Sequence, residues 1–183
     1  MVTITDDGIV GVPMSWEDYL DLPDDTRAEY ADGFVYVSPS PTYGHQWICR
    51  QLSEVLRVAF PSADVIIAAG WTSTAARRWL RVPDVSVLRA APHGDHITDP
   101  PVIAVEVMSS NRSDDRVRKY AEYFEAGAEQ YWIVDPRDRA IDVFGRGPGG
   151  WDSLARLTDA VPDAVVTTSL GDVVLSLATV LDR

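Results

Sequence analysis

The chain of 183 residues contains very little lysine and cysteine. Lys119 stands alone against fifteen arginines, and Cys49 is the single cysteine. One cysteine excludes an intramolecular disulfide and a cysteine-rich zinc cage. Because Cys49 lies in an apolar helical stretch, we interpret it as a small core residue. No apolar run approaches 18 residues, and the start lacks the basic and apolar stretches of a secretory signal. We therefore expect no membrane span and a cytoplasmic location.

Basic residues are also few relative to acidic ones, and the formal net charge is −12. A protein that binds nucleic acid over a large area usually presents a basic face. The electrostatic field of this acidic protein, averaged over its surface, repels DNA. Binding of nucleic acid therefore needs a local basic patch. The candidate contacts are Arg77, Arg78 and Arg81 in one segment and Arg112 and Arg116 in another. Such clusters fit a solvated face equally well.

Length and composition fit one globular domain. Hydrophobic residues make up 46% and charged residues 24% of the chain, which is ordinary globular usage. We expect residues 1–13 to be a flexible N-terminal segment and residues 14–183 to form a single domain.

The apolar pattern predicts a mixed sheet with helices. Two short strands flank a turn at Asp32-Gly33, and a long amphipathic helix runs from about Tyr43 to Phe60. A strand over 102–108, a helix over 114–126 and a strand over 130–135 form a crossover, which implies parallel strands. The fold class is therefore α/β or α+β, with a mixed β-sheet flanked by helices.

Other elements are predicted with less detail. Strands are expected from Val85 and over 151–157, and residues 170–181 fit either a strand or a helix. On the helix over 114–126, the apolar stripe consists of Val117, Tyr120, Ala121 and Phe124, whereas Lys119 lies on a different side. This helical-wheel pattern is compatible with a solvent-exposed Lys119 and also with a Lys119 that lies in a site at the edge of the helix.

Glu106 interrupts the apolar strand over 102–108. Burial of an ionised carboxylate costs several kcal/mol unless the group is paired or binds a metal. Asp84, at the start of a neighbouring strand, brings a second carboxylate close, and a divalent cation relieves their repulsion. Oxygen ligands favour magnesium or manganese over zinc. Lys119, 13 residues beyond Glu106, adds a positive charge that stabilises charge developing on a phosphate.

Structural alternatives remain open for each of these residues. A buried ion pair between Glu106 and Lys119 explains both without catalysis, and Asp115 offers Lys119 an ordinary helix salt bridge. Asp84 also fits the role of a residue that caps or terminates a strand.

The order of acids and lysine resembles the PD-(D/E)XK nuclease superfamily. Pro83-Asp84 matches the opening motif and Glu106 the second acid, but Met108 stands where the usual lysine is expected, and Lys119 fits a lysine moved to the next helix. The wider pattern resembles the Uma-two family of putative restriction endonucleases over roughly residues 14–177. The matching segments are Glu29–Gly33, Ser38–Pro41 with His45, Pro83–Val85, Val105–Ser109, Asp115–Lys119 with Tyr123, and Gly127–Pro136.

This resemblance implies a restriction-endonuclease-like fold, a magnesium site and a homodimer. By position, Asp84 and Glu106 would hold the metal, Lys119 would serve the water and the transition state, and Glu29 would be an accessory acid. Glu29 also fits a surface strand position. His45, Tyr123 and Gln130 are possible accessory residues, although each also fits a surface or packing role.

The residues together predict a metal-dependent phosphodiesterase, specifically a DNA endonuclease with magnesium-activated water. The alternative is a non-catalytic dimeric binding or regulatory protein on a nuclease fold, which the net charge of −12 and Met108 favour.

Overall fold

The computed structural model describes residues 3–4, 10–23, 26–37, 40–72, 79–108 and 113–183. The side chains of residues 3, 4, 10 and 113–117 lie outside this description.

The first half of the chain is mostly short strands around one long helix. Its elements are β1 (Thr3–Ile4), β2 (Val10–Pro13), α1 (Trp16–Leu20), β3 (Ala28–Ala31), β4 (Phe34–Val37), α2 (Tyr43–Ala59), β5 (Asp64–Ile67), β6 (Trp71–Thr72), β7 (Trp79–Arg81) and β8 (Val85–Leu88). The second half contains β9 (Ile103–Val107), α3 (Ser113–Glu125), β10 (Gln130–Asp135), β11 (Ala140–Arg146), β12 (Trp151–Leu157), β13 (Asp163–Thr168), β14 (Gly171–Ser176) and α4 (Leu177–Leu181).

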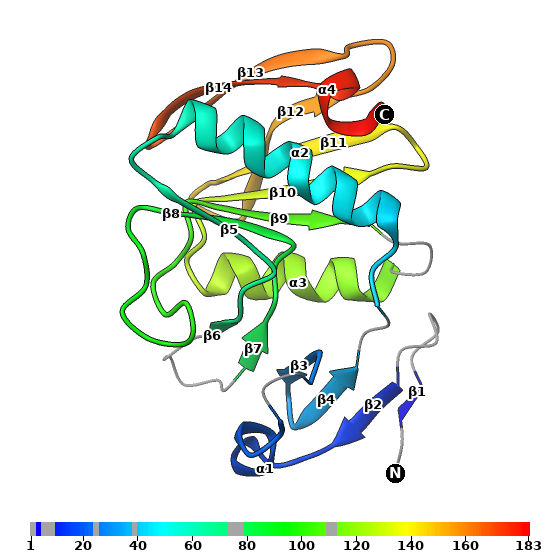
Figure 1. The fold of residues 1–183 in the computed structure, drawn as a ribbon, viewed down its shortest axis with the longest axis vertical. Coiled ribbons are helices and arrows are strands. Elements are labelled where there is room, and N and C mark those ends of the chain that lie inside the picture. The colour runs from blue at the N-terminus through cyan, green and yellow to red at the C-terminus, as the bar shows by residue number, and fades with distance from the viewer. Residues whose placement is uncertain (1–2, 5–9, 24–25, 38–39, 73–78, 109–112) are drawn as a thin grey trace.

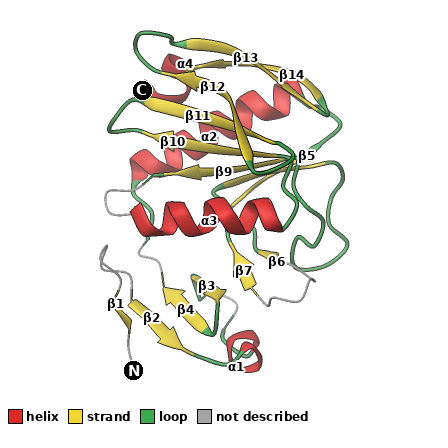
Figure 2. Cartoon of the chain, turned by 180° about the vertical axis from the view of Figure 1, so that it is seen from behind, coloured by secondary structure: helices red, strands yellow, loops and turns green. Residues whose placement is uncertain are grey.

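The central sheet has the strand order β12-β11-β10-β9-β8-β5. β9 and β10 are parallel and joined by α3, whereas the other pairs are antiparallel. The predicted crossover and mixed sheet are thereby confirmed. α2 lies across one face of this sheet and α3 across the other (Figures 1 and 2). Residues of β9 alternate between the two faces: Val105 and Val107 pack with the α2 core, and Ala104 packs with the α3 core.

A second sheet, with the order β1-β2-β4-β3-β7-β6, lies beyond α3 at the N-terminal end of the molecule (Figure 1). Its β3 and β4 form the predicted hairpin, in which Asp32 has φ 54° and Gly33 φ 81°. These positive values suit the turn that this dipeptide favours. Within the segment 1–13, Thr3–Ile4 form β1 and pair with β2 (Val10–Pro13), which in turn pairs with β4, so these residues belong to the second sheet. Without β2, an edge of β4 would lack hydrogen-bond partners.

The C-terminal segment supplies a two-stranded ribbon, β13-β14, followed by α4. Residues 170–181, for which the sequence fits a strand or a helix, thus contain both. Val166, Val173 and Leu175 pack into the core beneath α2. The predicted strand over 151–157 is present as β12.

α2 begins after its N-cap, Thr42, whose side chain accepts a hydrogen bond from the backbone N–H of His45 at 3.2 Å. This cap satisfies one of the helix's first amide groups and fixes His45 in the first turn. One turn further on, Cys49 is buried in the core, as predicted. No helix in the described part of the chain is long and apolar enough to cross a membrane.

α3 differs from its predicted orientation. Ala121, assigned to the apolar stripe, is exposed, while Lys119, Glu122 and Tyr123 are buried. The helical wheel counted only apolar side chains, but the inner face of α3 meets charged partners on the sheets. Pairing with those partners compensates the burial of the charges.

Candidate functional site

Glu106 lies near the end of β9, on the side of the central sheet that faces α3. It is only 5% exposed, yet it has polar partners. The Nζ of Lys119 donates to Glu106 Oε1 at 3.1 Å, and the hydroxyl of Tyr123 donates to the same oxygen at 2.7 Å. Lys119 and Tyr123 are four residues apart, so one face of α3 presents both.

Glu29 reaches the same lysine from the second sheet. Lys119 Nζ donates to Glu29 Oε1 at 3.0 Å, and the backbone N–H of Val82 donates to this oxygen at 3.0 Å. The lysine is 3% exposed, so it is not the solvent-exposed residue that the wheel allowed. Its ammonium therefore bridges β3 of one sheet and β9 of the other.

Arg81 completes this charge cluster. Its side chain is fully buried, and its Nε and one terminal nitrogen donate to the two carboxylate oxygens of Glu122 at 2.7 and 2.9 Å. The other terminal nitrogen donates to Glu29 Oε2 at 3.1 Å. This two-point geometry suits the planar guanidinium. The sequence-based assignment of Arg81 as an exposed nucleic-acid contact is therefore wrong.

The pKa values of two groups reflect this environment. Burial alone would raise the pKa of Glu29, but the charges of Lys119 and Arg81 and the Val82 hydrogen bond outweigh it and lower the pKa from 4.5 to about 2. Burial, reinforced by the charge of Glu106, raises the pKa of Tyr123 well above its ordinary value. At neutral pH Glu29 is thus ionised, and Tyr123 keeps the proton that it donates.

Asp84 lies directly before β8. β8 pairs with β9 so that Val85 is opposite Val105, and one step further along this antiparallel register Asp84 is opposite Glu106. The backbone N–H of Val107 donates to Asp84 Oδ2 at 2.8 Å. The structure thus brings Asp84, Glu106, Lys119 and Glu29 to one end of the central sheet.

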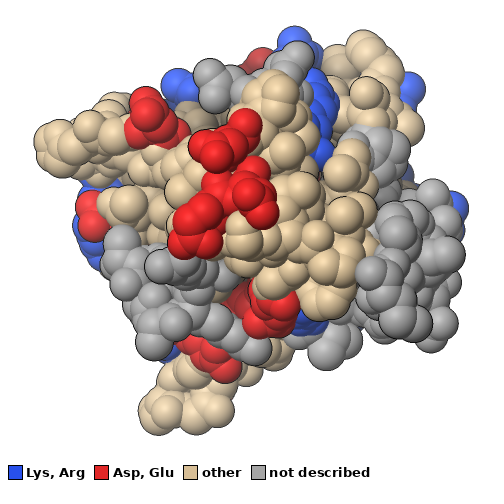
Figure 3. Space-filling view, turned by 90° about the horizontal axis from the view of Figure 1, so that it is seen from below, with Lys and Arg blue, Asp and Glu red and all other residues tan. Residues whose placement is uncertain are grey.

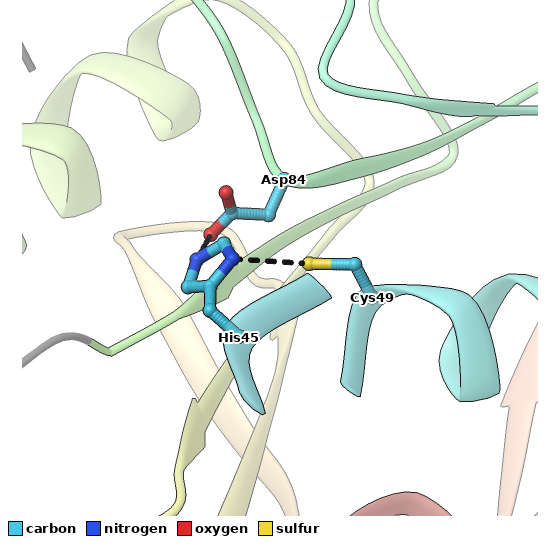
Figure 4. Close-up of side chains that lie close together, drawn as sticks. All are labelled: His45, Cys49 and Asp84. Atoms are coloured by element: carbon cyan, nitrogen blue, oxygen red, sulfur yellow. Dashed lines mark hydrogen bonds and ion pairs between the residues drawn. The ribbon is translucent and has the colours of Figure 1, made fainter. Parts of the chain in front are cut away.

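His45 and Cys49 approach Asp84 from α2. His45 Nε2 is 3.2 Å from Asp84 Oδ2, and Cys49 Sγ is 3.6 Å from His45 Nδ1 (Figure 4). Burial, followed by the charges of Asp84 and Glu106, raises the pKa of the Cys49 thiol. The sequence predicts Asp84 and Glu106 as metal ligands and His45 as a possible accessory residue, and the structure places the His45 imidazole and the Cys49 thiol beside Asp84.

The remaining predicted residues lie elsewhere or outside the described residues. Gln130 donates to Thr167 O at 2.8 Å and accepts from Trp132 Nε1 at 2.9 Å. It pairs with Ile103, at the opposite end of β9 from Glu106, and has a structural role. Outside the described part of the chain lie Arg77, Arg78 and Arg112, together with the side chain of Arg116.

Sequence reasoning missed Glu122, the pairing of Arg81 and the approach of Cys49. One local signal was present for Cys49: it follows His45 by four residues, which places both side chains on one helix face. Arg81 and Glu122 are 41 residues apart, and no local pattern joins them.

No curated protein matches the chain. A putative nuclease of known crystal structure from Anabaena variabilis is 20% identical, with a TM-score of 0.74 over 92% of this chain and 98% of that one. At this identity the likeness shows the α+β fold. A family model matches residues 16–175, nearly the whole of the described domain. The chain therefore belongs to the Uma2 family, whose description is "putative restriction endonuclease".

Proposed function

We propose that this protein is a magnesium- or manganese-dependent endonuclease that hydrolyses phosphodiester bonds in DNA. Family membership and the likeness to a protein described as a putative nuclease support this class of reaction. The observation that carries the proposal is the convergence at Lys119, which donates to Glu29 and Glu106 while Asp84 stands opposite Glu106.

The charges of the cluster fit a divalent cation. Among the described residues, Lys119 and Arg81 contact the carboxylates of Glu29, Glu106 and Glu122, whereas Asp84 contacts His45. A divalent cation would relieve the repulsion between the neighbouring carboxylates of Asp84 and Glu106, and carboxylate oxygens are the ligands that magnesium prefers.

Asp84 and Glu106 would hold the cation, which when bound supplies Lewis acidity and lowers the pKa of coordinated water. The chain's own residues orient the site. Tyr123 fixes the position of Glu106 by its hydrogen bond, and Val107 N–H fixes that of Asp84. Lys119 supplies a positive charge beside the carboxylates, where it would stabilise charge developing on a phosphate. Glu29, anchored by Arg81, holds the lysine in place.

The surface charge restricts how a polyanion reaches the site. Acidic side chains gather on the face seen from below (Figure 3). α1 lies at this end of the molecule (Figure 1); Glu17 and Asp18 within it and Asp21 at its C-cap are exposed. This face repels phosphate, so DNA would approach the cluster from another side.

The test is cleavage of supercoiled plasmid DNA with magnesium or manganese, with an RNA substrate in parallel. We expect the wild type to nick the plasmid and Asp84→Asn to lose at least about a hundredfold in rate. Asp138→Asn is the matched control, because Asp138 is exposed and lies outside the cluster. Circular dichroism would verify that both variants fold. Cleavage by Asp84→Asn at the wild-type rate would refute the proposed role, and cleavage of RNA alone would refute the DNA substrate.

A second candidate is a non-catalytic binding protein that keeps the acids as structural ion pairs. Met108 at the usual lysine position and the near-complete burial of Lys119 favour it. Calorimetry separates the two functions: the nuclease requires magnesium or manganese binding that Asp84→Asn weakens, and the binding protein does not. Homodimerisation and a cytoplasmic location stay predictions.

A further inference from the structure

Nitrogen, sulfur and oxygen donors meet where α2 passes the start of β8 (Figure 4). His45 and Cys49 lie one turn apart on α2, and Asp84 faces them from the residue before β8. The residues therefore come from two elements far apart in the sequence, and the packing of α2 on the central sheet brings them together.

The spacing of the three side chains suits a single cation. His45 Nε2 is 3.2 Å from Asp84 Oδ2, and the other ring nitrogen, Nδ1, is 3.6 Å from Cys49 Sγ. One ligand atom from each residue lies within 4.8 Å of the other two. Ligands of a tetrahedral zinc ion stand about 3.3–3.8 Å from one another. The 4.8 Å limit is wider than this spacing, so a bound cation would draw the three ligand atoms closer together.

We propose that His45, Cys49 and Asp84 form a binding site for one borderline divalent cation of the zinc type. A thiolate and an imidazole select zinc or cobalt, whereas magnesium is bound through oxygen atoms. Cys49 would bind as the thiolate, with its proton released to solvent. His45 would use one ring nitrogen as the ligand and keep the other for a hydrogen bond, as metal-bound histidines usually do.

The site is reachable and distinct from the proposed magnesium position. The side chains of His45 and Asp84 are 13% and 17% exposed, so two of the three ligands touch solvent, while Cys49 is buried. One oxygen of Asp84 faces His45, and the other is directed away from it (Figure 4). A single carboxylate can therefore serve both positions. The inference goes beyond the nuclease activity and holds whether or not the protein cleaves DNA.

Cobalt provides a direct probe because its bond to a thiolate gives a charge-transfer absorption in the near ultraviolet. Titration of the full chain with cobalt(II) should produce this band with one equivalent bound. Cys49 is the only cysteine, so the band identifies the ligand. Cys49→Ser should abolish it, and His45→Asn should weaken cobalt binding by about tenfold or more. The matched control is His93→Asn, because His93 is an exposed loop histidine.

Two results would overturn the site: absence of the band in folded wild-type protein, or release of the cobalt by a modest excess of magnesium. In either case the three residues are a hydrogen-bonded chain that orients Asp84. Retention of the band in a protein without nuclease activity would support the zinc-type site and count only against the proposed function. Circular dichroism of both variants shows whether a lost band reflects a lost ligand or a lost fold, and His45→Asn supplies a second test if Cys49→Ser does not fold.

Discussion

Glu29→Gln removes one negative charge from the buried cluster while keeping the shape of the side chain. In the wild type, Lys119 and Arg81 lower the pKa of Glu29 from 4.5 to about 2. One pKa unit corresponds to about 1.4 kcal/mol. The ionised carboxylate therefore contributes about 3 kcal/mol to the free energy of unfolding at neutral pH, and the variant should be destabilised by about this amount at pH 7.

The pH dependence of this difference follows from the direction of the shift. Because the pKa of Glu29 is lower in the folded state, its contribution is fully present above about pH 4.5 and is lost as the pH falls toward 2. From these two pKa values, about 2 of the 3 kcal/mol should be gone at pH 3. The variant lacks this titration, so the gap between the two proteins should narrow to about 1 kcal/mol at pH 3.

Urea denaturation of both proteins between pH 7 and pH 3 measures this gap, and the titration of carboxylates outside the cluster cancels in the difference. A gap that stays constant over this range would contradict the electrostatic account, because the loss would then come from packing or from the Val82 hydrogen bond alone. A gap that widens with acid would show that the pKa of Glu29 is raised in the folded state.

Three further changes test the same cluster and its support. Tyr123→Phe should lower the free energy of unfolding by about 2 kcal/mol, measured by thermal denaturation, because Glu106 loses a buried hydrogen bond to its charge. Arg81→Lys should cost about 3 kcal/mol or more in urea, since lysine cannot bind Glu122 at two points, whereas exposed Arg156→Lys should change stability by less than about 0.5 kcal/mol. Gly127→Ala should lower the free energy of unfolding by about 1–2 kcal/mol in urea, because the φ of Gly127 is 99° and the new Cβ would lie 3.1 Å from a proline side chain. Unchanged stability of Tyr123→Phe, Arg81→Lys or Gly127→Ala would contradict the cause given for that variant.

The parts of the fold that local pattern specifies were predictable. Asp32-Gly33 predicts the hairpin because few other dipeptides accept two positive φ values. The apolar run around Glu106 predicts a doubly buried strand, and the helix that follows it predicts a parallel partner. A lone charge in such a run also indicates a partner nearby. The ion pair between Glu106 and Lys119 could therefore be predicted from the sequence as one of several alternatives.

The rest depends on contacts between distant segments. Arg81 ends a short strand, where an arginine is usually solvated, and its burial becomes understandable only once Glu29 and Glu122 face it from other elements. The orientation of α3 was predicted wrongly for the same reason. Its apolar residues favour one face, but ion pairs to both sheets decide which face is buried.

Lys119 joins the two large sheets through one ammonium group, because Glu29 belongs to β3 and Glu106 to β9. Both the packing of the two sheets and the proposed chemistry thus require a cation at position 119. A relative that had lost catalysis would still be under selection to keep a compact cation there, since its removal would take a cationic partner from two buried carboxylates. Retention of this lysine among relatives is consequently no marker of activity. Asp84 makes no contact with Lys119 among the described interactions, so under the proposed mechanism its loss would distinguish inactive lineages.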